Sequence, residues 1–130
     1  MSDRQELRAP GQAEPISHYT DAVRAGDLLF VSGCVAVDAE GALVGEGDVV
    51  AQARQAFGNV GAILQAGGCS FADVVKVTVY LTDVEDRVRI NPVRQELFGS
   101  TRPASTLVEV SGLAVPGALV EVEAVAAVPR

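Results

Sequence analysis

Apolar residues recur along the chain with two different periods, and each period predicts one kind of element. Between residues 48 and 68 they return every three or four positions, which is typical of an amphipathic helix: Val49, Ala53, Ala56, Phe57, Val60 and Leu64. Asp48 is a suitable N-cap for this helix, and Gly67 and Gly68 supply the stop signal.

Strict alternation predicts strands elsewhere. Residues 72–81 alternate Val75, Val77, Val79 and Leu81 with polar side chains. Residues 27–37 indicate another strand, and Gly33 in its middle indicates a bulge or a close approach of another group to the backbone. A turn at 38–41 and a short returning strand at 42–44 follow.

Further along, Asn91 is a fitting N-cap and Pro92 a fitting first residue for a second helix, which Gly99 ends. Residues 105–126 then read as a closing β-hairpin that turns at "AVPGA". The expected order is ββαβαββ in an α+β fold, with two helices on one face of a sheet. Residues 1–15 are expected to form a loose arm or an edge segment, and residues 16–130 a single domain.

This layout leaves the second face of the sheet without a cover. The first strand and the closing hairpin are apolar on both faces, and a chain of 130 residues has no third layer to spare. We therefore expect an oligomer that packs its sheets together.

Composition limits the classes of function. The chain is 48% hydrophobic, which is enough for one ordinary core, and no run of ~18 apolar residues predicts a membrane span. The charged N-terminus has no apolar stretch of a secretory signal, so we expect a cytoplasmic protein. A net charge of −7 with scattered arginines argues against nucleic acid as a partner.

Metal and thiol chemistry have little support. One histidine and two cysteines do not make a metal-ligand cluster, and we expect neither a metal nor a cofactor. Cys34 and Cys69 are read first as small buried hydrophobes.

Five blocks in sequence carry a resemblance that covers residues 16–128: "LLFVSGCVAVD", "AQARQAFGNVGAILQAGG", "DVVKVTVYLTDVED", "INPVRQELF" and "RPASTLVEVSGL…GALVEVEAVA". Together they resemble the Rid (reactive intermediate deaminase) family, also known as YjgF. The resemblance implies a chorismate-mutase-like fold and a homotrimer with a central barrel-like core. It also implies three clefts at the subunit interfaces, where enamines or imines are hydrolysed to a 2-keto acid and ammonia.

The resemblance also implies roles for individual residues. Glu121 matches the glutamate that positions the attacking water, and Tyr19, Ser32 and Asn91 match side chains that line the cleft. Backbone amides at Thr106 or Leu107 are further candidates to orient water or substrate. The family's carboxylate-binding arginine follows a Pro-Ala pair, and here Ser105 stands in its place.

Loss of a bidentate guanidinium removes a charged contact that one serine hydroxyl does not replace. We therefore expect 2-imino acids to be poor substrates and the native substrate to be non-standard. Arg102 is a possible substitute, although it lies about 10 Å from Ser105 along an extended chain, and a solvated surface arginine is the simpler interpretation. His18 and Cys34 are further possible site residues, with an exposed loop histidine and a core cysteine as the simpler interpretations.

The closing strands carry three glutamates. Glu121 and Glu123 share one face of their strand, and Glu109 is expected across from one of them. For Glu109 and Glu123 we expect structural hydrogen bonds or solvent, and for Glu121 a function that only the resemblance assigns.

Two classes of function remain open on these grounds. One is an enamine/imine hydrolase with an altered substrate. The other is a non-catalytic member of the family, which binds a small ligand or a partner enzyme. A third possibility, RNA cleavage, is disfavoured by the net charge of −7.

Overall fold

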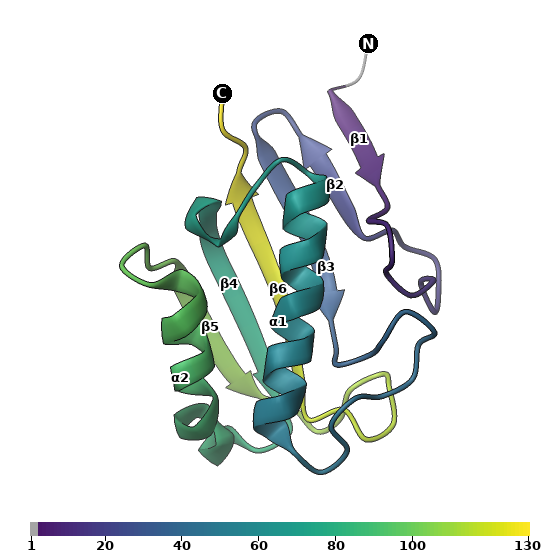
Figure 1. Cartoon of the computed structure of the whole chain (residues 1–130), viewed down its shortest axis with the longest axis vertical. Coiled ribbons are helices and arrows are strands. Elements are labelled where there is room, and N and C mark those ends of the chain that lie inside the picture. The colour runs from purple at the N-terminus through teal and green to yellow at the C-terminus, as the bar shows by residue number, and fades with distance from the viewer. Residues whose placement is uncertain (1–2) are drawn as a thin grey trace.

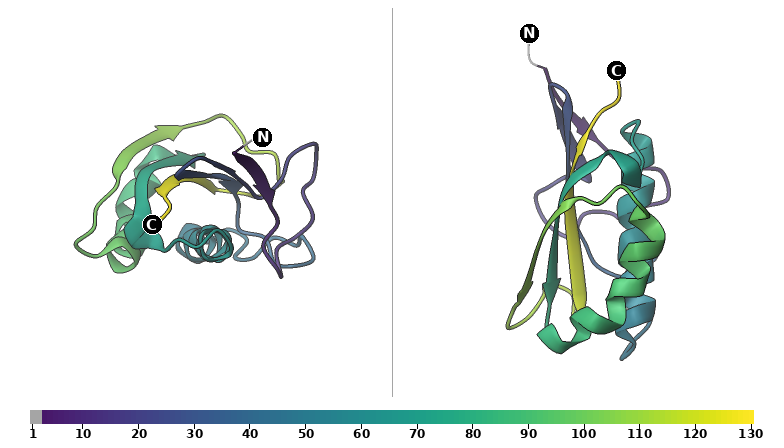
Figure 2. Two further views of the ribbon diagram at one scale, coloured as in Figure 1. Left: turned by 90° about the horizontal axis from the view of Figure 1, so that it is seen from above. Right: turned by 90° about the vertical axis from the view of Figure 1, so that its left-hand side faces the viewer.

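A six-stranded sheet forms one layer of the molecule, and two helices cover one of its faces (Figures 1 and 2). The computed structural model describes residues 3–130, so the first two residues of the predicted arm lie outside it. In chain order the strands are β1 (Arg4–Leu7), β2 (Ala22–Ala25), β3 (Leu28–Cys34), β4 (Val74–Leu81), β5 (Ala104–Glu109) and β6 (Val120–Ala127). The helices are α1 (Val49–Ala66) and α2 (Arg87–Phe98), and the α+β prediction is confirmed.

The N-terminal strands form one side of the sheet. β1 pairs antiparallel with β2, and β2 with β3, so residues 4–7 are an edge strand. The predicted short strand at 42–44 is reduced to a single bridge between Val37 and Leu43. β2 was not predicted, because four residues are too short a stretch for an alternation to stand out.

The predicted closing hairpin is wrong. β6 lies between β3 and β4 and is antiparallel to both, whereas β5 pairs in parallel with β4 at the far edge. Every second side chain of β6 is buried beneath the helices, which suits a central strand. β5 buries no side chain fully, which suits an edge. The α2 crossover between β4 and β5 makes their parallel pairing possible.

Helix α1 begins and ends where the sequence predicts. Asp48 accepts a hydrogen bond from the backbone N–H of Ala51 at 3.1 Å, and Gly67 is the C-cap. The buried side of α1 presses Phe57 against the sheet, where its ring meets Phe71 and Phe98. Edge-to-face contacts of this kind add to the stability from burial alone.

Helix α2 begins earlier than predicted, because the short 3₁₀ helix Val84–Asp86 runs directly into it at Arg87. Asn91 and Pro92 are therefore inside the helix and not at its start. Pro92 costs the hydrogen bond to the carbonyl of Val88, which belongs to the exposed first turn, where water can replace it. Gly99 ends the helix at a φ of 57°, as expected of a C-terminal glycine.

A bulge changes the alternation of β4. The register against β6 shifts between Val74 and Lys76, so Val74 faces the core and Val75 is 48% exposed. The prediction that Val75 lies in the buried row is therefore wrong, while Val77, Val79 and Leu81 are buried as expected.

The face of the sheet opposite the helices keeps large apolar side chains at the surface, as the sequence indicated. These are Leu28, Phe30, Val75 and Val108, between 39% and 48% exposed. The oligomer expected to cover them stays a prediction. In the described part of the chain, no helix has the length and apolar character required to cross a membrane.

Gln52 joins three segments and provides a test of this packing. Its fully buried side chain donates to the carbonyls of Gly45 and Gly117 and accepts from the N–H of Leu119. We expect Gln52→Leu to lower the free energy of unfolding by about 1–3 kcal/mol, because three backbone groups lose their partner. Urea denaturation measures this. Gln65→Leu, at an exposed position of the same helix, is the control. The prediction would be contradicted if Gln52→Leu changed the free energy of unfolding as little as Gln65→Leu does.

Candidate functional site

Gly33 of β3 lies directly against the acidic side chain of Glu121 on the neighbouring strand β6. The register of β3 against β6 shifts between Val31 and Cys34, which is the bulge that the sequence indicated. A Cβ atom at Gly33 would lie only 2.1 Å from Oε1 of Glu121. A side chain at position 33 would therefore displace the Glu121 carboxylate, which occupies that space.

Glu121 and Glu123 point away from the helices, on the same face of β6, as predicted. The hydroxyl of Tyr80 donates a hydrogen bond to Glu123, which raises the pKa of Tyr80. Burial, with a further contribution from the nearby Glu123, raises the pKa of Glu121 above the ordinary value of a glutamate. Glu121 therefore takes up a proton more readily than an ordinary glutamate does.

Glu109 does not join this pair, so its predicted place across from Glu121 or Glu123 is wrong. β5 lies beside β4, and Glu109 is in register with Leu81. It accepts a hydrogen bond from the N–H of Val84 at 2.9 Å, in agreement with the structural role expected for it.

Tyr19, from the loop between β1 and β2, and Ser32, from β3, line the same groove as Glu121. Ser32 donates through its hydroxyl to the carbonyl of Thr20 at 2.6 Å, and the hydroxyl of Tyr19 accepts from the N–H of Ile16. Behind this loop, Arg8 donates to the buried carboxylate of Asp21 at 3.0 Å. A groove of about 410 Å³ results, and the following residues, called the Glu121 half-site below, are in its lining: Tyr19, Ser32, Gly33, Glu121 and Glu123.

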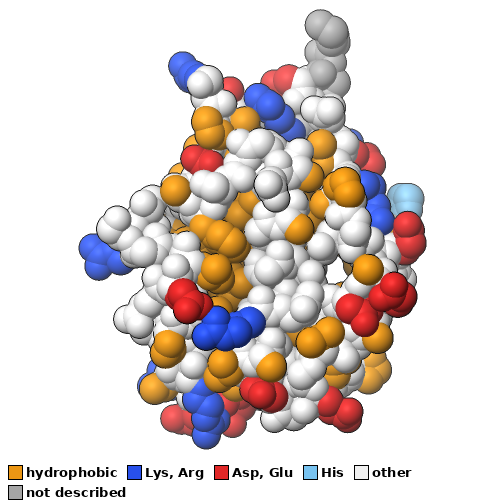
Figure 3. Space-filling view, in the orientation of Figure 1, with side chains coloured by type: hydrophobic (Ala, Val, Ile, Leu, Met, Phe, Trp, Pro, Cys, Tyr) orange, Lys and Arg blue, Asp and Glu red, His pale blue; other side chains and the backbone are white. Residues whose placement is uncertain are grey.

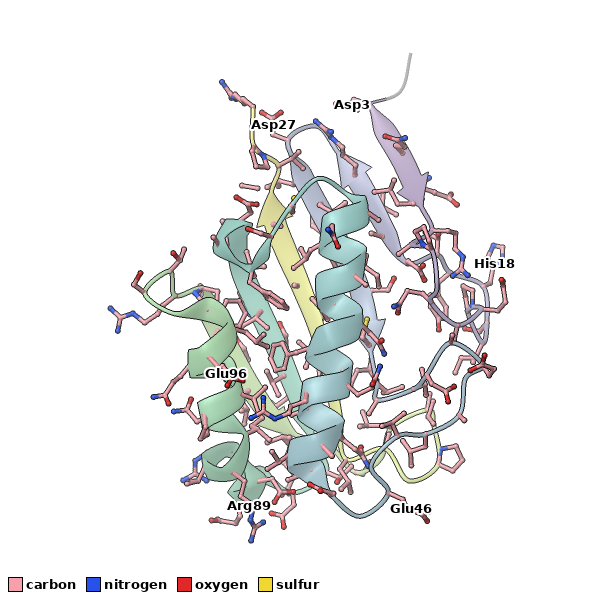
Figure 4. All side chains as sticks on the ribbon, viewed as in Figure 1. Asp3, His18, Asp27, Glu46, Arg89 and Glu96 are labelled. Atoms are coloured by element: carbon pink, nitrogen blue, oxygen red, sulfur yellow. The ribbon has the colours of Figure 1, made fainter. Side chains whose placement is uncertain are left out.

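The two less certain candidates near this groove have different positions. His18 is exposed and projects from the β1–β2 loop away from the body of the molecule (Figures 3 and 4). Cys34 packs against the core, and burial, together with the charges of Asp21 and Glu121, raises its pKa to about 12. A thiol with so high a pKa carries no thiolate at neutral pH and is a poor nucleophile.

The remaining predicted residues lie on α2, on β5 and in the loop that joins them. Ser105 and Leu107 are in register with the buried Val77 and Val79, so their side chains face the helices. Asn91 and Leu107 line one shallow groove there, and Asn91 and Arg102 line the groove beside it.

Arg94 lines both of these grooves, and the sequence analysis missed it. Its Nη2 atom donates a hydrogen bond to Oγ of Ser105 at 2.7 Å. One signal was available, since Asn91 and Arg94 are three residues apart and share a helix face. We call Asn91, Arg94, Arg102, Ser105 and Leu107 the Arg94 half-site.

The two half-sites do not meet within one chain. β4 separates β6 from β5, which puts their backbones roughly 10 Å apart. Moreover, Glu121 points to the face without helices, whereas Ser105 points to the face with helices. Each half-site presents polar groups at its own side of the molecule, and neither contains both an acid and a guanidinium placed for chemistry.

A metal site is not evident in the region that the structure describes. Within residues 3–130, no three side chains of the histidine, cysteine, aspartate or glutamate type gather so that they could hold an ion.

The fold defines a small α+β protein with two separate polar sites, one beside Glu121 on the central strand β6 and one beside Arg94 on α2. A family model described as Endoribonuclease L-PSP matches residues 10–128. The chain therefore belongs to this family, the YjgF/Rid family.

Two named relatives support the assignment of the chain to this family. A RutC family protein of Pyrococcus horikoshii is 43% identical over 113 residues, which are 87% of this chain and 89% of that protein. The human 2-iminobutanoate/2-iminopropanoate deaminase is 37% identical over 119 residues, 92% of this chain and 84% of that protein.

Solved structures show the same fold. Escherichia coli TdcF with bound serine has a TM-score of 0.88 at 31% identity, with 96% of this chain and 99% of that one covered. The Rid family protein YyfA of Yersinia pestis has a TM-score of 0.90 at 31% identity, with the same coverage.

Gly33→Ala tests the contact between Gly33 and Glu121. The added methyl group would push the Glu121 carboxylate out of its partly buried place, so we expect the pKa of Glu121 to fall towards the ordinary value. Carboxyl-carbon NMR titration measures this. We expect the free energy of unfolding to change by less than about 1 kcal/mol, because the flexible end of Glu121 can move away. Gly58→Ala, where no atom lies near, is the control. An unchanged Glu121 titration in Gly33→Ala would contradict the prediction.

Proposed function

We propose that the protein is a hydrolase of enamine and imine C=N bonds. The reaction takes place in a cleft between subunits, which the Glu121 half-site of one subunit and the Arg94 half-site of another form together. The observation that carries the proposal is the Glu121 carboxylate. It lies against a bare glycine in a polar groove, and its pKa is raised by burial and by Glu123.

These properties suit a group that moves protons at neutral pH. A carboxylate with a raised pKa is a stronger base, and it keeps a transferred proton long enough to return it to the substrate. Glu121 accepts a proton as a water molecule adds to the imine carbon. The resulting carbinolamine breaks its C–N bond, and the proton returns to the departing nitrogen. The balance is one imine and one water for one carbonyl compound and one ammonia.

Completion of the cleft by a second copy explains two features together. The half-sites of a single chain face away from each other, and the face of the sheet without helices keeps Leu28 and Phe30 exposed. A homotrimer, as the family resemblance implies, would cover these side chains and bring the edge of one subunit to that of the next.

The names of relatives agree with this chemistry. The human, goat and bovine relatives are 2-iminobutanoate/2-iminopropanoate deaminases, at 37%, 41% and 40% identity. The bound serine of TdcF is a small amino acid, which is the size of ligand that such a cleft would hold.

Two other functions have weaker support. The family description and two structural neighbours carry the word endoribonuclease, but a net charge of −7 disfavours the many phosphate contacts of RNA binding. A non-catalytic ligand binder would also have a cleft, but it would not need the raised pKa of Glu121. The two possibilities separate on whether Glu121→Gln changes turnover or binding alone.

Imine hydrolysis by Glu121→Gln tests the proposal directly. An amino acid oxidase generates 2-iminopropanoate or 2-iminobutanoate, and semicarbazide traps the imine that survives. We expect Glu121→Gln to lose at least about 100-fold in rate, because it cannot accept the proton of water. Glu96→Gln, which removes an exposed glutamate of α2 paired with Arg54, is the control. A wild type without activity on either imine or on neutral imines would contradict the proposal.

The pH profile supplies a second, independent prediction. The base must be ionised, so kcat/KM should fall as the pH falls through the raised pKa of Glu121. Glu123→Gln removes the neighbouring negative charge and should move this acidic limb to lower pH. If Glu123→Gln leaves the limb in place, Glu121 is not the group that titrates.

Mixed oligomers test whether two subunits share the cleft. Glu121→Gln and Asn91→Ala affect different half-sites, so each variant alone loses activity at every cleft. Coexpression at equal amounts should give about a quarter of the clefts two intact halves, and activity should recover in that proportion. Recovery that does not exceed the sum of the separately purified variants would show that one chain supplies the whole site.

A further inference from the structure

The Arg94 half-site is a local concentration of positive charge on a protein whose net charge is −7. Arg87, Arg94 and Arg102 all line the two adjoining grooves. Most arginines of this chain have a carboxylate within reach, such as Arg8 with Asp21. Within residues 3–130, however, Arg94 and Arg102 make no ion pair with a carboxylate. Arg87 pairs with Glu85, whereas the charges of Arg94 and Arg102 are left for a group outside the chain.

Arg94 is the arginine that is held in place. It rises from the middle of α2, three residues after Asn91, and its guanidinium reaches β5, where Nη2 donates to Oγ of Ser105 at 2.7 Å. The residue is half-buried, and burial lowers the pKa of Arg94 from its ordinary value without threatening its charge. A partly desolvated cation without a counter-ion is unfavourable, which indicates that an anion completes it.

Arg102 does not have these properties. It is exposed, and in the described part of the chain no hydrogen bond orients its guanidinium. It lies at the rim of the same groove, where solvent screens its charge.

We infer that Arg94 binds the carboxylate of the substrate, from α2, at the place where the family resemblance puts an arginine on β5. Ser105 is a positioning residue in this arrangement. Its hydroxyl accepts from Arg94 and keeps its own proton free to donate to the same carboxylate. The guanidinium has further N–H groups for a second contact, so the anion receives charge-assisted hydrogen bonds from two elements of the fold.

This inference rests on the proposed function and narrows its substrate class to imines that carry a carboxylate. The expectation that 2-imino acids are poor substrates depended on the absence of a guanidinium beside position 105. Arg94 supplies a guanidinium there.

A binding measurement separates this inference from catalysis. The stable probe is 2-oxobutanoate, the keto product of 2-iminobutanoate, and 2-butanone is its counterpart without the carboxylate. Calorimetry or ligand-observed NMR on the oligomer should show that 2-oxobutanoate binds the wild type more tightly than 2-butanone. Arg94→Gln should weaken the binding of 2-oxobutanoate by about 10- to 100-fold and change the binding of 2-butanone by no more than about twofold. Arg54→Gln, on the exposed side of α1, is the control that should change neither.

A relocated arginine gives the second arm. Arg94→Gln/Ser105→Arg returns the guanidinium to β5 and should recover most of the lost affinity, while Arg94→Gln/Ser105→Ala should not. The inference would be overturned if Arg94→Gln left the affinity for 2-oxobutanoate unchanged. It would also be overturned if Arg102→Gln lowered this affinity as much as is expected of Arg94→Gln. The proposed hydrolysis fails separately, if the wild type binds 2-oxobutanoate through Arg94 but turns over no imine.

Discussion

The structure depends on the insertion of β6 between β3 and β4. This last strand hydrogen-bonds on both sides and buries Val120, Val122 and Ala124 beneath the helices. Because side chains alternate along a strand, the same insertion turns Glu121 and Glu123 to the opposite face. It also leaves β5 with β4 as its one neighbouring strand, so β5 becomes an edge of the sheet. Both half-sites follow from the place of this one strand.

The division of polar groups between two sides of the sheet is a consequence of that topology. The acid is backed by Gly33 in the interior of the sheet, whereas the guanidinium reaches an edge strand from a helix. Within one chain these groups would stay solvated and apart. In an oligomer, a neighbouring subunit would partly desolvate both the acid and the guanidinium. Their electrostatic interactions with a substrate would then be stronger than in water. Assembly and chemistry would then depend on the same contacts.

In the proposed arrangement the guanidinium comes from α2, whereas the family resemblance puts it on β5. The positive charge stays at the same end of β5, but it is held from a different element. The side chain of Arg94 is long and crosses from the helix to the strand, and Ser105 fixes its end. A contact of this kind escapes a comparison made position by position, because the serine at 105 seems to remove the function. Only the packing of α2 against the β5 edge shows that a neighbouring residue occupies the space.

Local patterns were sufficient for the elements whose signals are local. The helical period and its caps predicted α1, the alternation predicted β4, and Gly33 indicated the bulge and the close approach that Glu121 makes. The same patterns failed where a long-range choice decides. An alternating strand does not encode its neighbours, so residues 105–126 were paired as a hairpin although each strand pairs elsewhere. Likewise, no local signal links Arg94 to Ser105, because their contact exists only once α2 packs beside β5. By itself the sequence determined most of the elements, and its family resemblance made Glu121 a candidate. The tertiary structure decided which side chains lie together, since strand order and helix packing are set by burial over the whole sheet.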